Sequence, residues 1–239
     1  MFKQKFIASV ALAATLVLSA GLTGLAFAGK PKKSAKFTVR IENISDKEGQ
    51  TAADGTKYPF ALSPGLYIVS NGKTEIFRSG KKAGPELESQ AEDGDPSLLA
   101  KRFAAKSGEG VFNTPVGASM PGPLLPGNSF EFSFTATEGQ KLDLVAMFGQ
   151  SNDLFYGPEK AIALFDADGK PVTGDVTAWF LLWDAGTEVN QAPGIGPDQA
   201  PRQKAKNTGA VEDVPVAPVK DGFTYPNTTD VLRITITAQ

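Results

Sequence analysis

Two carboxylates stand four residues apart directly after an apolar run, with a glycine between them. Asp184 and Glu188 follow the run 177–182, and Gly186 lets the backbone turn tightly. A turn that brings the two carboxylates together leaves like charges facing each other unless a cation lies between them. Calcium accepts carboxylate and carbonyl oxygens in flexible geometry, so this spacing is compatible with a calcium site. The alternative is that the carboxylates cap the turn by accepting hydrogen bonds from backbone N–H groups.

A third acid lies in another predicted loop. Asp153 belongs to the stretch 151–157, which follows an apolar strand that ends at Phe148. If the strands before the two loops end at the same edge of a sheet, Asp153 joins Asp184 and Glu188. A second acidic pair, Asp166 and Asp168, does not match a calcium-binding EF-hand loop, because position twelve of that pattern is Thr177 instead of Glu. We therefore expect a hairpin turn at 166–170.

The composition excludes several kinds of chemistry. The 239 residues include no His and no Cys, so Ser-His and Cys-His nucleophilic pairs, imidazole or thiolate zinc sites and disulfides are all impossible. Oxygen ligands remain, and these are the ligands of hard cations. The chain carries 24 basic and 26 acidic residues, a balance that argues against a nucleic acid as partner. We interpret the lysines of 29–36 as a solvated basic arm.

The first 28 residues have the pattern of a secretory signal peptide. A short basic segment at 1–6 precedes an uncharged apolar stretch from Ile7 to about Leu25, and Ala26-Phe27-Ala28 supplies small residues for cleavage before Gly29. The alternative is an uncleaved membrane anchor, since the apolar stretch is nearly long enough to span a bilayer. We expect cleavage between Ala28 and Gly29, a secreted or periplasmic protein, and no stable membrane insertion afterwards.

Strand patterns dominate the remaining chain. Alternating or continuous apolar residues predict strands at 37–42, 65–70, 130–135, 141–148, 161–165, 176–183 and 231–237. The segment 74–77 is a candidate hairpin partner of 65–70 across Asn71-Gly72, and 176–183 is expected to be central because it is the most hydrophobic. Long loops rich in Gly and Pro occupy 113–128 and 190–222. We predict an all-β protein with one domain at 37–239, an antiparallel β-sandwich with at most one or two short helices.

Only one segment has a clear helical pattern. Asp95 and Pro96 can start a helix that continues to Phe103. The acidic run from Glu86 to Asp95 is interpreted as a solvated loop. Trp179 and Trp183 share a face of the predicted strand and could form a sugar-stacking platform if exposed, but the flanking Phe and Leu residues favour a place in the core.

The carboxylate loop also resembles a known family. The run Trp183-Asp184-Ala185-Gly186-Thr187-Glu188 is similar to the W-D-A-G-T-[DE] motif of spondin N-terminal domains, the module of F-spondin and mindin. The stretch 151–155 stands at the place of that family's S-P-D-W-F, and the segments 37–43 and 61–65 are similar to its secreted bacterial members. The similarity extends over most of 36–215. Animal members have Asp where this chain has Glu188, and they have cysteines that this chain lacks.

The resemblance implies a β-sandwich related to C2 domains with one bound calcium ion. Its ligands would be Asp153, Asp184 and Glu188. The implied function is non-catalytic adhesion or recognition of an extracellular or cell-surface protein or glycan. Two alternatives remain: a carbohydrate-binding module with a structural calcium ion and loop aromatics such as Phe155, Tyr156 and Tyr225, and a hydrolase that uses paired carboxylates. The hydrolase is the weakest of the three, because carboxylates committed to a metal are not free for acid–base chemistry.

Overall fold

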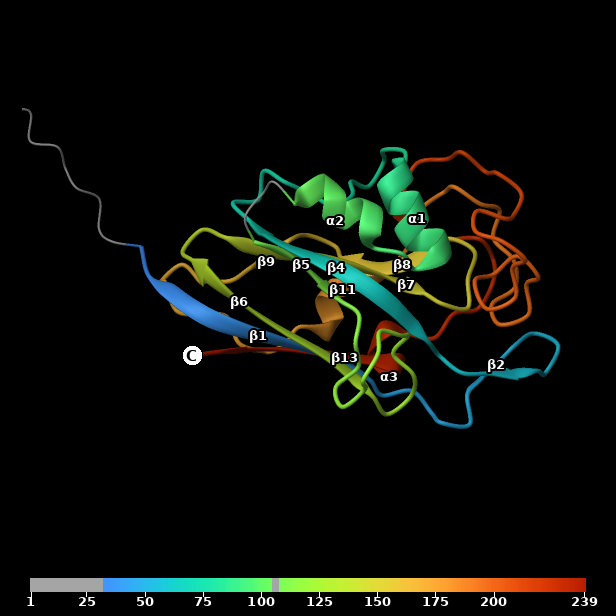
Figure 1. Cartoon of the computed structure of the whole chain (residues 1–239), viewed down its shortest axis with the longest axis horizontal. Coiled ribbons are helices and arrows are strands. Elements are labelled where there is room, and N and C mark those ends of the chain that lie inside the picture. Colours follow the sequence, from blue (N-terminus) through green and yellow to red (C-terminus); the bar gives the residue numbers. More distant parts are fainter. Residues whose placement is uncertain (1–31, 105–107) are drawn as a thin grey trace, which may run out of the picture. The chain divides into compact units, whose positions relative to one another are not determined.

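Antiparallel strands form two packed sheets in the computed structural model, which describes residues 32–104 and 108–239 (Figure 1). The predicted signal peptide, 1–28, and the start of the predicted basic arm lie outside the described residues. Residues Lys32–Gln239 form one compact unit. No helix among the described residues has the length and hydrophobicity needed to cross a bilayer.

The first sheet has four strands in the order β10-β13-β1-β6. Its members are β1 (Ser34–Asn43), β6 (Ser129–Thr137), β10 (Gly174–Asp175) and β13 (Leu232–Ala238). Strand β1 lies between β6 and β13, and its alternating sequence sends Phe37, Val39 and Ile41 into the core with no exposed surface. The predicted arm therefore ends earlier than expected, because Ser34 already pairs with Thr137 in the β1–β6 ladder.

The second sheet has seven strands, with the path β12-β11-β8-β7-β4-β5 and β9 paired to β7. Its members are β4 (Leu62–Ser70), β5 (Glu109–Phe112), β7 (Lys141–Phe148), β8 (Leu154–Pro158), β9 (Ile162–Ala163), β11 (Phe180–Asp184) and β12 (Ala217–Pro218). Two short strands, β2 (Gln50–Thr51) and β3 (Lys57–Tyr58), form a separate hairpin. The central strand β7 is buried on both faces, which explains why it is apolar at nearly every position.

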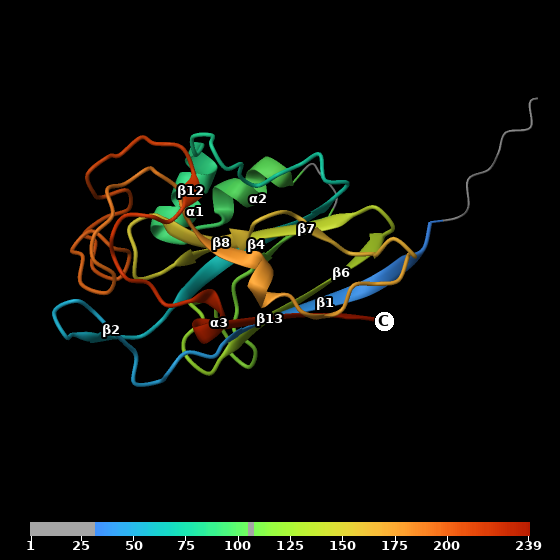
Figure 2. The same cartoon turned by 180° about the vertical axis from the view of Figure 1, so that it is seen from behind.

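Two helices cover the outer face of the larger sheet. These are α1 (Pro85–Asp93) and α2 (Ser97–Phe103), and the views from front and back show them on the side of that sheet that faces away from β1, β6 and β13 (Figures 1 and 2). A 3-10 turn, η1 (Thr177–Trp179), precedes β11, and the single-turn helix α3 (Thr228–Val231) precedes β13.

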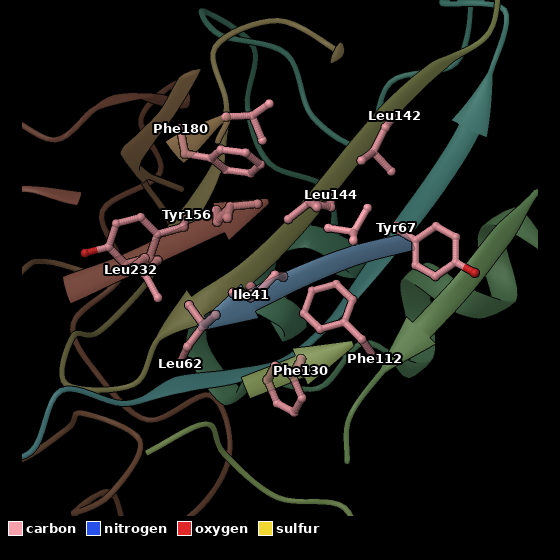
Figure 3. Packing of buried hydrophobic residues seen from close by; sticks show 14 of the residues in the cluster. Ile41, Leu62, Tyr67, Phe112, Phe130, Leu142, Leu144, Tyr156, Phe180 and Leu232 are labelled. Atoms are coloured by element: carbon pink, nitrogen blue, oxygen red, sulfur yellow. The ribbon is translucent and has the colours of Figure 1, made fainter. Parts of the chain in front are cut away.

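The larger sheet consequently separates two hydrophobic cores. Side chains from both sheets fill the first core, as Figure 3 shows for Leu142 and Leu144 of β7 facing Ile41 of β1. Val145 points to the other face and packs with Leu87 and Leu99 of the helices in the second core. Each such side chain contributes roughly 1.5–3 kcal/mol when fully buried, so the helices are held to the sheet by apolar packing.

The β-sandwich prediction is confirmed, together with most of its strands. The helix expected after Asp95 is α2, and the amide of Ser97 donates to Asp95 Oδ1 over 3.0 Å. The acidic run was expected to be a loop, and that prediction is wrong, because it forms most of α1. With α3, the described residues contain three helices besides η1, where at most two had been expected.

Two strand predictions are wrong. Residues 74–77 form no strand, because both edges of β4 are already occupied by β5 and β7. Segment 176–183 is not one central strand: its first half forms η1, and β11 has only the two-residue β12 on its far side. Trp183 is buried as expected, whereas Trp179 is 47% exposed because η1 turns it out of the sheet.

Candidate functional site

The strands β8 and β11 bring the predicted acidic residues to one end of the sandwich. They pair antiparallel, with Asp184 opposite Leu154, so the residue before β8 lies beside the residues after β11. The amide of Ala185 donates to the backbone oxygen of Asp153 over 3.2 Å, which continues the ladder beyond the last pair. The expectation that Asp153 lies beside the loop 184–188 is therefore correct.

The carboxylate of Asp153 fixes the loop 184–188 by accepting hydrogen bonds from it. Its side chain has no exposed surface. Its Oδ2 accepts hydrogen bonds from the Thr187 amide (2.7 Å), the Thr187 hydroxyl (3.2 Å) and the Glu188 amide (3.1 Å). Its Oδ1 is buried and has no hydrogen-bond partner. Oδ2 of this carboxylate therefore has all the hydrogen bonds it can accept, while Oδ1 lacks the donor or cation that a buried oxygen needs.

Asp184 and Glu188 have different surroundings. Asp184 Oδ1 accepts from the Gly186 amide (2.7 Å) and its Oδ2 accepts from the Asn190 side chain (2.7 Å). These are the bonds of a turn-capping carboxylate. Glu188 is only 3% exposed, and its Oε2 accepts a hydrogen bond of 3.3 Å from the Asn152 amide group.

A fourth carboxylate comes from α1 and was not predicted. Glu92 is 2% exposed, and its Oε2 is buried without a hydrogen-bond partner. It lies close enough to Glu188 for its negative charge to disfavour ionisation of the Glu188 carboxyl group and so raise the pKa of that group. The spacing of Leu87 and Ala91, which share the buried face of α1, was the available signal, but the surrounding acids masked it.

Burial perturbs the ionisation of all four groups. Loss of hydration raises the pKa of Glu92, Asp153 and Glu188 to about 7, and it also raises the pKa of Asp184. Neighbouring charges add to this: Asp184 acts on Asp153, and Glu92 on Glu188. None of the ion pairs among residues 32–104 and 108–239 includes any of the four. The cluster must therefore hold protons or gain a cation to be stable.

The cluster supplies the oxygen ligands that a hard cation prefers, but only some of these oxygens are positioned to bind one ion. All the side chains offer oxygen, and two buried oxygens, on Asp153 and Glu92, lack partners. As the side chains stand, however, no three acidic groups in the described part of the chain converge closely enough to coordinate one ion. Asp184 is the predicted ligand with least support, because both its oxygens already serve the loop.

Two glycines, Gly186 and Gly209, allow the surrounding loops to pack closely against the cluster. Gly186 has φ of +68°, and its carbonyl accepts from the Val214 amide over 2.8 Å. Gly209 packs against the carboxylate of Glu188, where a Cβ would lie 2.4 Å from Oε2. The long loop 190–222 therefore covers the cluster and leaves the carboxylates little access to solvent.

The other predicted feature, the turn at 166–170, is a hairpin turn as expected. The Asp166 carboxylate accepts from the amides of Asp168 (2.9 Å) and Lys170 (2.8 Å), so it is used by the turn itself.

The chain matches no protein-family model and no curated protein sequence. The resemblance to spondin N-terminal domains therefore stays a prediction. Fold and site together define an antiparallel β-sandwich with a buried acidic cluster under the loops at one end.

Proposed function

We propose that this protein is a secreted, non-catalytic β-sandwich domain that binds one calcium ion at the acidic loop end and acts in adhesion or in recognition of an extracellular ligand. The single observation that carries the calcium proposal is the buried acidic cluster, which forms no ion pair with any Lys or Arg in the described part of the chain. Buried carboxylates that lack a cation are costly, and a divalent ion would remove that cost.

Asp153, Glu188 and Glu92 are the side chains best suited to hold the ion. Asp153 and Glu92 each offer an oxygen without a hydrogen-bond partner, and Glu188 lies near both of them. Asp184 would act mainly by ordering the loop that carries Glu188. The signal-peptide pattern supports secretion, and the resemblance to spondin domains supports a recognition role.

The burial of the cluster favours a binding role over hydrolysis. Asp153, Glu92 and Glu188 are between 0% and 3% exposed, which leaves a substrate no route to these carboxylates. A raised pKa is common at catalytic carboxylates, but here burial inside the fold accounts for it.

The test is thermal unfolding of residues 29–239 in EDTA and in millimolar calcium. An ion that binds only the folded state at a hundredfold excess over its Kd adds about 2.7 kcal/mol. For a domain of this size that corresponds to a rise in Tm of roughly 5–10 °C. We expect this rise in the wild type and its loss in Asp153→Asn and Glu92→Gln.

Control variants show whether the calcium response is lost because the cluster is altered or merely because one negative charge is removed. Asp168→Asn and Glu48→Gln remove exposed carboxylates that have no side-chain hydrogen bond among the described residues, and they should keep the full calcium response. A wild type whose Tm does not change with calcium contradicts the proposal. So does a response that survives in both cluster variants.

A further inference from the structure

A second polar site lies on the helix-covered face of the larger sheet. A cavity of about 730 Å³ opens between the loop 73–84, the start of α1 and the end of α2. This volume is within the range of small-molecule sites. The cavity shares no lining residue with the acidic cluster, so a ligand here does not depend on the proposed calcium ion.

The lining of this cavity is basic in a chain that is acidic overall. The whole sequence has a net charge of −2, whereas five cationic side chains and only two carboxylates, Glu75 and Glu86, line the cavity. The cationic residues are Lys73, Arg78, Lys81, Lys82 and Arg102. Such a concentration of one sign of charge attracts anions.

Two of these cations are left without an acidic partner. Arg78 pairs with Glu75 at 2.7 Å, Arg102 with Glu86 at 3.8 Å, and Lys82 with Asp213 at 2.6 Å. Lys73 and Lys81 form no ion pair with any residue that the structure describes. Each arginine has five N–H donors, so the paired guanidinium groups also keep donors for a ligand.

The loop that carries these charges is held in place before any ligand binds. The Ile76 amide donates to Asp143 Oδ2 over 3.1 Å, which fixes the loop to β7. Phe77 packs edge-on against Phe155 and Trp183, with ring centroids 4.9 and 5.0 Å away. A preorganised loop lowers the cost of ordering groups on binding.

A second backbone link closes the other side of the loop. The amide of Gly80 donates to the Val216 oxygen (2.8 Å), and the Val216 amide donates back to the Lys81 oxygen (2.9 Å). Lys81 is thereby placed at the rim by hydrogen bonds on both of its sides.

The residues that line the cavity expose mainly polar groups, which favours a polar ligand. The apolar residues beneath the cavity, Ile76, Leu87 and Val216, are each at most 2% exposed and present almost no surface to a ligand. The accessible polar groups are the cations, the two carboxylates and the Thr74 hydroxyl, and the partly exposed Phe77 and Ala83 add a smaller apolar surface. Hydroxyl-rich ligands can donate to the carboxylates while their anionic groups meet the lysines.

We infer that this basic cavity binds a small anionic saccharide, with its anionic groups on Lys73 and Lys81. The shared chemistry is a sugar that carries carboxylate or phosphate groups. Binding here would supply the ligand-recognition part of the molecule at a site separate from the metal.

The test is calorimetric titration of residues 29–239 in EDTA with digalacturonate and with fructose 1,6-bisphosphate. The first ligand tests carboxylates and the second tests phosphates, with cellobiose, fructose and inorganic phosphate as comparison ligands. We expect at least one anionic sugar to bind with a Kd of about 1 mM or below and the neutral sugars not to bind.

Variants assign the binding to the cavity. The double variant Lys73→Gln, Lys81→Gln should weaken binding by about tenfold or more, since each lysine supplies a charge-assisted hydrogen bond. The matched double variant Lys57→Gln, Lys170→Gln removes two exposed lysines outside the cavity and should change Kd by less than about twofold. Thermal unfolding of each variant confirms that it is folded.

Three results would overturn the inference. The first is that neither anionic sugar binds, and the second is that both double variants weaken binding equally, which would reflect only diffuse charge. The third is that inorganic phosphate binds as tightly as the sugar phosphate, which would remove the saccharide from the assignment. Because calcium is absent throughout, failure of this site would leave the calcium proposal unaffected.

Discussion

Single buried carboxylates determine how this protein should respond to pH. Asp143 lies on the helix-facing side of β7, is 6% exposed, and accepts the Ile76 amide. Burial raises its pKa from 3.8 to about 6, although hydrogen bonds from the Ile76 and Leu144 amides oppose the shift. The native state therefore keeps a proton that the unfolded chain releases near pH 4.

This proton makes stability fall as pH rises. The contribution of Asp143 is fully present below about pH 4 and is lost as pH rises through about 6, since the native state binds more protons in that interval. In EDTA, Asp143→Asn should remove on the order of 2 kcal/mol of the stability difference between pH 4 and pH 7. Urea unfolding of both proteins at the two pH values measures this difference. Equal pH dependence of the two proteins would contradict the assignment.

Single residues also show how far sequence reasoning about the site could go. Asp153, Asp184 and Glu188 were recognisable because each follows or precedes an apolar strand. Glu92 was not, because its role depends on how α1 packs against β7 and β8, and nothing local marks which acid of a run faces inward. The hydrogen bonds that occupy both oxygens of Asp184 are local, since Gly186 and Asn190 belong to the same loop, and they match the turn-capping alternative that the sequence offered.

At the scale of elements, the loop after β11 depends on a left-handed residue. Gly186 has φ of +68°, and a Cβ there would lie 2.4 Å from the Val214 oxygen. Gly222 has φ of +90° with nothing within 4 Å of the same position. Both glycines therefore have a left-handed backbone, but a side chain would meet neighbouring atoms only at Gly186.

Alanine at these two positions separates backbone strain from close packing. Gly222→Ala should cost about 1 kcal/mol of stability, the price of a left-handed backbone alone. Gly186→Ala should cost roughly 3 kcal/mol, because the segment around Val214 must also move. Urea unfolding gives both values, and equal costs would mean that the loop relaxes freely around the added methyl group.

Strand patterns predicted the sheets well where one face is buried and the other exposed. Strand β1 is such a case, with Phe37 and Val39 inward and Thr38 outward. The pattern failed at 177–179, the first part of the apolar run, which forms η1 instead of continuing strand β11. Apolar character there reflects the two hydrophobic cores on either side of β11, and a sequence of this kind does not distinguish a strand from a tight turn.

At the scale of the whole molecule, the ion would connect segments far apart in the chain. The loop after β11, the C-terminal end of α1 and the long loop 190–222 meet around the cluster. Backbone hydrogen bonds join the two loops: the Glu212 amide donates to Thr187 (3.0 Å) and the Val189 amide donates to Ala210 (2.7 Å). A side-chain hydrogen bond of 2.9 Å from Gln203 to Asp93 joins the long loop to α1. Opening any of these segments exposes the carboxylates, so calcium binding should oppose their local unfolding.

Hydrogen exchange tests this coupling across the molecule. At a hundredfold excess of calcium over its Kd, exchange of the Thr187, Glu188 and Val189 amides should slow by about a hundredfold, because the open state loses the ion. The amides of Asp168 and Lys170, in the hairpin turn at 166–170, open without disturbing the cluster and should be unchanged. Slowing confined to other regions would place calcium elsewhere on the molecule. Equal slowing of both groups of amides would mean that the loops open only when the whole sandwich unfolds.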